Sequence, residues 1–227
     1  ARVAVEGSRR TLAMLYPDAE ILSRGPELAS RRDVELRWRF DRNPDSWSLG
    51  TFQVEPGRLR NSPSGADSAP DWWTQPLSLP LASPLELARP MRFALTFRIP
   101  EGQPVGPVML NVGGYYLAFL TAGDQSRFAG GEGTPRSLLE SLELGGVSGY
   151  EGFSGFEPGK YHRLEIELST LASTRRGRIK AIRLDGRELK GPTFVPRPAT
   201  TPVVSLAAQG ALDLYSFELG ASEALPR

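Results

Sequence analysis

The chain has no cysteine and a single histidine, His162, among its 227 residues. Without cysteine there can be no disulfide, no thiol nucleophile and no Cys-ligated zinc. One histidine also excludes a His-rich metal site and a paired-histidine acid–base arrangement. We therefore assign no metal and no cofactor. The absence of cysteine does not by itself indicate in which cellular compartment the protein is located.

The sequence also lacks a large net charge and a long run of apolar residues. The 27 basic and 26 acidic side chains leave a formal net charge of +1, so no whole-chain field attracts nucleic acid or an anionic membrane. No apolar run reaches the roughly 20 residues that span a bilayer. We expect no nucleic-acid partner and no membrane insertion by this segment. Because the sequence begins at Ala1 rather than Met, an upstream signal, membrane anchor or further domain is left open.

What the chain does have is period-two alternation of apolar and polar residues, most clearly in its last third. His162, Leu164, Ile166 and Leu168 alternate with charged residues, as in a strand with one solvent-facing side. The Asp185-Gly186 pair predicts a tight hairpin turn. The three runs with this pattern are GKYHRLEIELS from Gly159, RIKAIRLDGRELKG from Arg178 and PVVSLAAQGALDLYSFELG from Pro202.

Similar patterns predict strands earlier in the chain. The clearest alternation is at 91–99, where Met91, Phe93, Leu95, Phe97 and Ile99 are expected to face inward. Pro56-Gly57 and Gly113-Gly114 predict two further hairpins. The other predicted strands are at 34–40, around 77–81, around 85–87, at 108–112 and at 115–120.

Two regions have no regular pattern. Residues 61–90 are rich in Ser, Pro, Ala and Leu, and only short edge strands are expected there. Residues 121–158 are rich in glycine and predict a long irregular loop with one helical turn at SLLESLEL. Near the N-terminus, Leu12 and Leu15 suggest a short helix that ends before Pro17.

About ten to twelve strands at regular spacing predict an all-β fold, a two-sheet antiparallel β-sandwich of jelly-roll type. We expect one such domain at 33–221. It follows an N-terminal leader or linker at 1–32, which contains the short helix, and precedes a C-terminal tail at 222–227.

The order of five segments resembles the concanavalin A-like lectin/glucanase superfamily over roughly residues 33–220. It is most similar to laminin-G-like bacterial domains and to the 3-keto-disaccharide hydrolase group. The resemblance implies a curved jelly roll whose concave face or rim loops often hold a glycan, in a superfamily with many non-catalytic modules. The segments are FDRNPDSWSLGTFQVEPGRLRNS, MRFALTFRI, GKYHRLEIEL, IKAIRLDGREL and VVSLAAQGALDLYSFELG.

The sequence nominates no catalytic residue. Retaining glucanases of this superfamily use a Glu-x-Asp-x-x-Glu strand, because two carboxylates about 5–5.5 Å apart must flank the glycosidic bond. The chain lacks that motif: Asp185 and Glu188 come nearest, but Arg183 stands where the first Glu should be. No Gly-x-Ser-x-Gly elbow is present either. We lean towards a non-catalytic protein.

Aromatic and polar side chains suggest a binding site instead, because sugar rings stack on aromatic faces and their hydroxyls need directional partners. Trp72 and Trp73 are expected in a loop, either binding a ligand or capping the open end of the sandwich. Tyr115 and Tyr116 are expected on opposite faces of a strand. The predicted ligand-binding residues are Trp72, Trp73, Tyr115, Tyr116, Asp124, Gln125, Arg127 and Tyr150.

The function expected from the sequence is a non-catalytic recognition or sensor module that binds a glycan. It would be part of a larger bacterial protein outside the cytoplasm, in the periplasm or at the cell surface. Two alternatives stay open: a carbohydrate-active enzyme of the 3-keto-disaccharide hydrolase type, and a protein–protein interaction domain with no sugar ligand.

Overall fold

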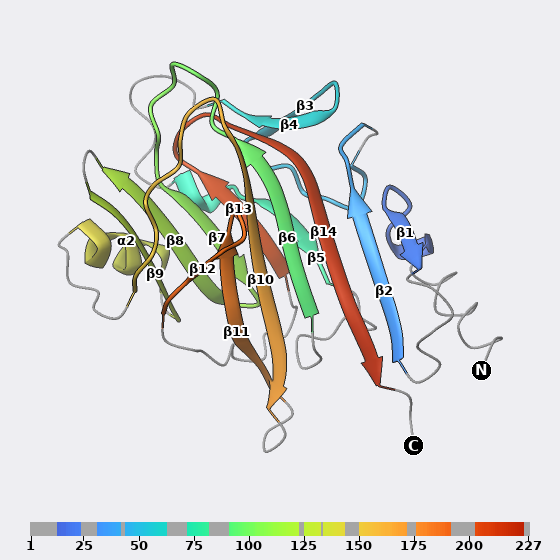
Figure 1. The fold of residues 1–227 in the computed structure, drawn as a ribbon. Helices are drawn as coiled ribbons and strands as arrows, with labels where there is room; N and C mark the ends of the chain where they lie inside the picture. The colour runs from blue at the N-terminus through green and yellow to red at the C-terminus, as the bar shows by residue number, and fades with distance from the viewer. Residues whose placement is uncertain are drawn as a thin grey trace.

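The computed structural model describes residues 13–23, 31–41, 44–62, 72–81, 91–122, 125–132, 134–143, 150–171, 176–191 and 203–224 (Figure 1). Two antiparallel sheets pack face to face, as the alternating sequence predicts. The predicted edge strand around 85–87, Asp124, and the outer ends of the predicted leader and tail lie outside the described residues. No helix in the described part of the chain is long and apolar enough to cross a membrane.

In the described part of the chain, sheet A has nine strands, and β14 is central to it because it pairs with β2, β6 and β4. The β3–β4 hairpin joins the sheet through β14. In sheet order the strands are β1 (Glu20–Ser23), β2 (Arg31–Trp38), β14 (Leu212–Ala224), β6 (Met91–Arg98), β10 (Tyr161–Leu171), β11 (Arg176–Leu184) and β12 (Arg187–Leu189), with β3 (Phe52–Glu55) and β4 (Arg58–Asn61) attached.

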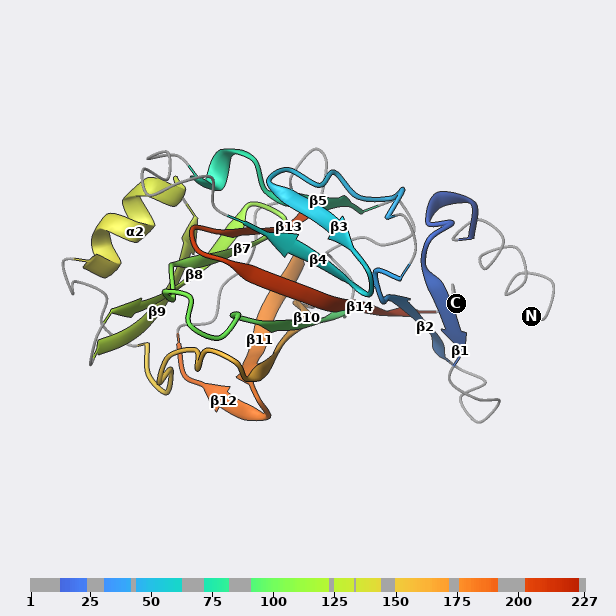
Figure 2. The same cartoon turned by 90° about the horizontal axis from the view of Figure 1, so that it is seen from above.

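Sheet B has five strands among the residues that the structure describes, with a 3-10 helix and an α-helix on its outer side. Figure 2 shows η1 (Trp72–Thr74) and α2 (Pro135–Glu143) on the side of sheet B that faces away from β10, β11 and β12. In sheet order its strands are β5 (Leu77–Pro80), β13 (Val203–Ala208), β7 (Val108–Val112), β8 (Tyr115–Ala122) and β9 (Gln125–Glu132).

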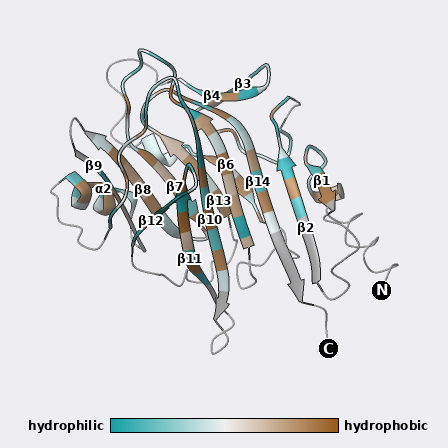
Figure 3. Ribbon diagram, in the orientation of Figure 1, coloured by the Kyte–Doolittle hydropathy of each residue, from teal (hydrophilic) through white to brown (hydrophobic). Residues whose placement is uncertain are grey.

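The core lies between the two sheets and follows the alternation read from the sequence. Along β6, the residues expected inside, from Met91 to Ile99, are all at most 4% exposed. The alternation of apolar and polar residues along β10 is visible in Figure 3. Trp38 lies between Tyr16 and Trp47 in two edge-to-face contacts with ring centroids 5.6 Å apart, so the N-terminal segment is attached to the same core.

The predicted hairpins are confirmed. Pro56-Gly57 joins β3 to β4, and Gly113-Gly114 joins β7 to β8. Asp185 and Gly186 join β11 to β12 with φ values of 53° and 79°. Two successive positive φ angles are typical of the tight turn that Asp-Gly favours. Ala13–Leu15 are helical before Pro17, in agreement with the short helix expected there.

The prediction of one long irregular loop at 121–158 is wrong for its first part. Residues Gln125–Glu132 form β9, which pairs with β8 along its whole length. Gly130 and Gly131 lack side chains and have low strand propensity, so the pattern was hidden in the sequence. The expected helical turn is α2, where Thr134 Oγ1 accepts a hydrogen bond from the Ser137 N–H as a helix cap.

The outer side of sheet A is held by ion pairs centred on two buried carboxylates. Asp213, which is 0% exposed, accepts hydrogen bonds from Arg60 Nε (2.7 Å) and Nη2 (3.0 Å). Burial alone would raise the pKa of the Asp213 carboxyl, but the Arg60 hydrogen bonds and the charges of Arg60, Arg58 and Arg98 lower it below its usual value. Glu218 behaves in the same way. Burial alone would raise the pKa of its carboxyl, but hydrogen bonds from Arg163 lower it below its usual value.

This arrangement predicts a loss of stability in acid. An unfolded aspartate has a pKa of about 4, and the folded pKa of Asp213 is lower. The unfolded chain therefore binds more protons, and the free energy of unfolding falls as the pH drops below about 4 and through the folded pKa. Urea unfolding measured across this range should show the fall.

The Asp213→Asn variant should be less stable at neutral pH by about 2–3 kcal/mol, as for hydrogen bonds to charged groups, and should lose part of the acid dependence. Asp41→Asn, at an exposed position, is the matched control and should behave like the unaltered protein. An acid dependence that is identical in Asp213→Asn would contradict the assignment.

Candidate functional site

The outer side of sheet B carries a second, smaller apolar cluster, which we call the outer cluster. It forms because α2 turns two buried leucines towards outward-facing residues of β7, β8 and β9. The buried members are Met109, Ala118, Ala129, Leu139 and Leu142, and the partly buried side chains packed against them are Trp72, Trp73, Tyr116, Leu120, Leu138 and Tyr150. Four of the eight predicted ligand-binding residues therefore meet here.

Trp72 and Trp73 form the aromatic centre of this surface. They lie in η1, which is placed against β13, and their rings meet edge to face with centroids 5.5 Å apart. Both side chains are half-buried, and both pack against the outer cluster. The pair therefore lies on the outer side of sheet B rather than capping the open end of the sandwich, which was the alternative drawn from the sequence.

Tyr115 and Tyr116 point to opposite faces of β8, as alternation predicts. Tyr115 is 0% exposed and belongs to the core between the sheets. Tyr116 is half-buried and packs against the outer cluster. Of the two, Tyr116 is the one on the same surface as the tryptophans.

Tyr150 packs against the outer edge of β9. Its hydroxyl donates a hydrogen bond to the Gly130 carbonyl oxygen (2.7 Å) and lies 3.5 Å from the Tyr115 hydroxyl. Its ring contacts Phe128 edge to face, with centroids 5.1 Å apart. Burial raises the pKa of the Tyr150 hydroxyl, so it remains a neutral donor over the physiological range.

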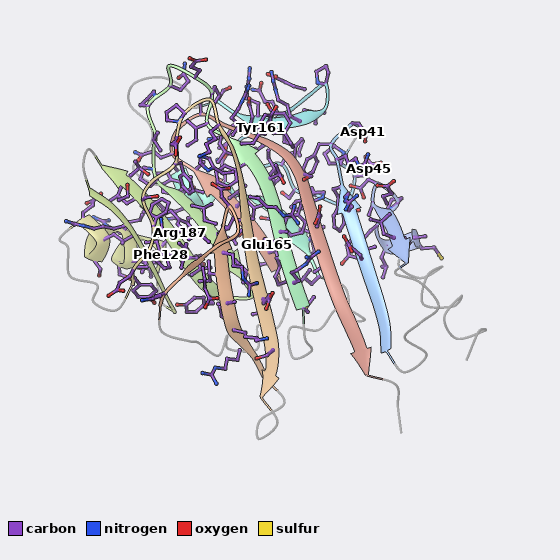
Figure 4. The ribbon with its side chains drawn as sticks, in the orientation of Figure 1. Asp41, Asp45, Phe128, Tyr161, Glu165 and Arg187 are labelled. Atoms are coloured by element: carbon purple, nitrogen blue, oxygen red, sulfur yellow. The ribbon has the colours of Figure 1, made fainter. Side chains whose placement is uncertain are left out.

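A pocket of about 260 Å³ opens beside Tyr150, between β9, the end of α2 and the segment 150–153. Figure 4 shows Phe128 beside α2, at this edge of sheet B. The wall combines the rings of Phe128, Tyr150 and Phe153 with the polar side chains of Arg127 and Glu151. Such a mixture suits a ligand with an apolar face and polar edges.

The edge of β9 also supplies backbone polar groups to the pocket. Since the Gly130 carbonyl points away from β8, alternate residues of the strand, Phe128 and Ser126, present their N–H and C=O groups to the same outer edge of β9. Both line the pocket. These fixed groups add hydrogen-bonding capacity to the side chains.

Arg127 and Glu151 hold the pocket walls in place. Arg127 Nη1 donates a hydrogen bond to the Leu142 carbonyl oxygen (3.0 Å), near the C-terminus of α2, where a cation is favourable. Glu151 and Lys190 exchange two backbone hydrogen bonds of 2.9 Å, and their side-chain charges are 3.7 Å apart. The 150–153 segment is thereby tied to the strand end beyond β12.

The eight predicted residues thus divide into groups. Trp72, Trp73 and Tyr116 share the outer surface of sheet B, Arg127 and Tyr150 line the pocket, and Tyr115 is in the core. Asp124 lies outside the described residues, and for Gln125 only the backbone in β9 is described. The prediction omitted Phe153 and Glu151, which also line the pocket. In the sequence, the one indication for them is that an aromatic and an acidic residue follow Tyr150 in a glycine-rich segment.

His162 has a structural role. It is 2% exposed, its Nδ1 lies 2.8 Å from Asp185 Oδ2, and its Nε2 accepts a hydrogen bond from the Glu157 N–H (3.0 Å). The ring packs between Phe97 and Phe156. It joins the β11–β12 turn to the start of β10. Among the described residues, no group of three His, Asp or Glu side chains is placed to hold a metal ion.

Comparisons with solved structures show a shared fold. The Emp47p carbohydrate recognition domain superimposes with a TM-score of 0.55 and 11% identity, covering 78% of this chain and 89% of that domain. The CBM2 module of the evolved Dit of Lactobacillus casei BL23 phage J-1 gives 0.51 and 10% identity, covering 88% and 100%. The chain therefore shares its fold, a two-sheet antiparallel β-sandwich of jelly-roll type, with these domains, as its sequence predicts.

No family model matches the sequence, and a search of curated proteins finds no match.

The close approach of Gly130 to Tyr115 gives a test of the pocket's framework. A Cβ at residue 130 would overlap the Tyr115 hydroxyl and come within 2.8 Å of Leu117 Cδ2. Gly130→Ala should therefore destabilise the protein by about 1–3 kcal/mol, the usual cost of overpacking. Urea unfolding measures the change.

Gly131→Ala is the matched control, because nothing lies within 4 Å of a Cβ at that position in the same strand. In a Tyr115→Phe background the penalty of Gly130→Ala should shrink, since the overlapping hydroxyl is gone. Equal penalties at positions 130 and 131 would show that the close contact is not as described.

Proposed function

We propose that the protein is a non-catalytic carbohydrate-recognition module that binds saccharides on the outer side of sheet B. The observation that carries the proposal is the meeting of Trp72, Trp73 and Tyr116, from separate parts of the chain, on one partly exposed surface beside the pocket of Arg127 and Tyr150. The shared fold with a carbohydrate recognition domain agrees with this assignment. A location outside the cytoplasm remains part of the proposal.

Aromatic rings on this surface suit sugar rings. The C–H face of a pyranose is apolar and stacks on an aromatic plane, while its hydroxyls need hydrogen-bonding partners at the edges. Trp72 and Trp73 are held against the outer cluster by packing, so little conformational freedom is lost on binding. The surface is therefore preorganised for stacking.

The pocket supplies the second requirement, directional polar groups. Arg127 and Glu151 provide a cation and an anion, and the edge of β9 provides backbone groups at Ser126 and Phe128. A volume of about 260 Å³ accommodates a unit of the size of one sugar ring. We assign the pocket to an end unit or branch of a saccharide whose other units contact the tryptophans.

The carboxylates at the site favour recognition without covalent chemistry over hydrolysis. Glycosidases need two carboxyl groups that flank one bond. Among the described residues that line the pocket, Glu151 is the sole carboxylate, and its partner is Lys190. A protein-interaction module, the other alternative, would bind no sugar in the experiment below.

Screening on a glycan array, followed by calorimetric titration of the saccharide that binds, tests the proposal. Replacing Trp72 and Trp73 by Ala should weaken binding at least about tenfold, equivalent to about 1.4 kcal/mol, because the stacking surface is lost. The double Phe variant keeps two aromatic faces and should retain most of the affinity. Thermal unfolding of each variant checks that it is folded.

Met14→Ala, at a side chain that is 83% exposed and far along the chain from the site, is the control and should bind as the unaltered protein does. The proposal fails if no saccharide binds, or if the folded Ala double variant binds with unchanged affinity.

A further inference from the structure

A partly exposed aromatic pair lies on the opposite sheet from the proposed saccharide surface. Tyr161, at the start of β10, is 55% exposed, and its ring contacts that of Tyr215 at a centroid distance of 4.9 Å. Figure 4 shows Tyr161 at the end of sheet A near the β3–β4 hairpin, well separated in the view from Phe128. We propose that this patch is a second binding site, for acidic saccharide chains, built from Tyr161, Tyr215 and the guanidinium groups of Arg58, Arg60 and Arg98.

Strand register brings these side chains into one row. Tyr161 pairs with Arg98 across β10 and β6, Arg98 pairs with Asp213 across β6 and β14, and Asp213 pairs with Arg60 across β14 and β4. Directly opposite residues share a face of the sheet and lie side by side. The row therefore crosses four strands on the outer side of sheet A.

A β-bulge adds Tyr215 to the row. The register of β14 against β6 shifts between Leu214 and Ser216, so Tyr215 is the extra residue. Leu214 and Phe217 both remain buried, and Tyr215 lies against outward-facing Tyr161 and Arg98. Bulges redirect side chains in this way at functional positions.

The two tyrosines are held by a cation beneath them. The Arg98 guanidinium carbon is 5.5 Å from the centroid of the Tyr161 ring and 5.9 Å from that of Tyr215, within cation–π range. Arg98 and Tyr215 both contact the Tyr161 ring, and its 55% exposure leaves the rest of this side chain open to solvent. An open ring fixed in this way can stack on a sugar.

The charges around the tyrosines favour an anionic ligand. Three guanidinium groups, those of Arg58, Arg60 and Arg98, face two carboxylates, Glu55 and Asp213. Asp213 is 0% exposed, whereas the side chains of Glu55 and the three arginines are 26–29% exposed, so three partly exposed cations face one partly exposed carboxylate. The excess of charge on the solvent-facing side chains is therefore positive. Guanidinium groups also bind carboxylates in a bidentate manner.

This chemistry differs from that of the sheet B surface. There the centre is two tryptophans on an apolar cluster, whereas here an aromatic ring is bordered by several cations. Uronate-type saccharides present on each unit both an apolar sugar face, which an aromatic ring can stack on, and a carboxylate, which a guanidinium group can bind. The proposal does not depend on the function assigned to sheet B.

The test is calorimetric titration of the protein with an oligogalacturonate and with a neutral gluco-oligosaccharide of equal length. The acidic chain should bind, and its affinity should fall as salt is raised because the contacts are ionic. Tyr161→Ala should weaken its binding about tenfold or more. This exposed position can be changed without opening the core, and thermal unfolding confirms that.

The double variant with Ala at positions 72 and 73 separates the two sites. It should keep its affinity for the acidic chain, whatever its effect on other saccharides. The proposal is overturned if the acidic chain does not bind, if Tyr161→Ala leaves its affinity unchanged, or if the tryptophan variant abolishes it. A dimer that Tyr161→Ala converts to monomer in light scattering would also overturn it, because a second copy would then cover the patch.

Discussion

Packing between the two sheets sets the rest of the structure, because each strand must turn alternate residues inward. Strand β14 illustrates this constraint: it pairs with three strands, and Leu212, Leu214, Phe217 and Leu219 are all buried. The residues between them are forced outward and must find partners there. Asp213 and Glu218 do so with arginines from neighbouring strands. The outer side of sheet A is thus organised by ion pairs, and that of sheet B by aromatic and apolar packing.

Much of the fold could be predicted because its determinants are local. Alternation at 91–99 fixes β6, and the Asp185-Gly186 pair fixes the turn after β11. Strand β9 could not be predicted, since its pattern is interrupted by Gly130, whose missing side chain leaves room for Tyr115. The need for that space arises only when β8 and β9 are paired. Helix α2 had its signal in the spacing of Leu139 and Leu142.

For the candidate site, residue types could be read from the sequence but their arrangement could not. Alternation was enough to separate Tyr115 from Tyr116. The position of Trp72 and Trp73 on the outer side of sheet B depends on where η1 packs, which no local pattern specifies. Tyr150 reaches the edge of β9 from a distant segment, through a hydrogen bond to Gly130. The patch around Tyr161 had one overlooked signal, an aromatic residue on the charged side of an alternating strand.

Tryptophan fluorescence during a saccharide titration tests the central claim most directly. Trp38 and Trp47 are 1% and 8% exposed in the core, and Trp72 and Trp73 are half-buried on the sheet B surface. A saccharide that stacks there should shift the emission to shorter wavelength and protect these two rings from a soluble quencher, in step with binding measured by calorimetry. Binding that saturates in the calorimeter with no change in emission or quenching would place the saccharide elsewhere and contradict the account.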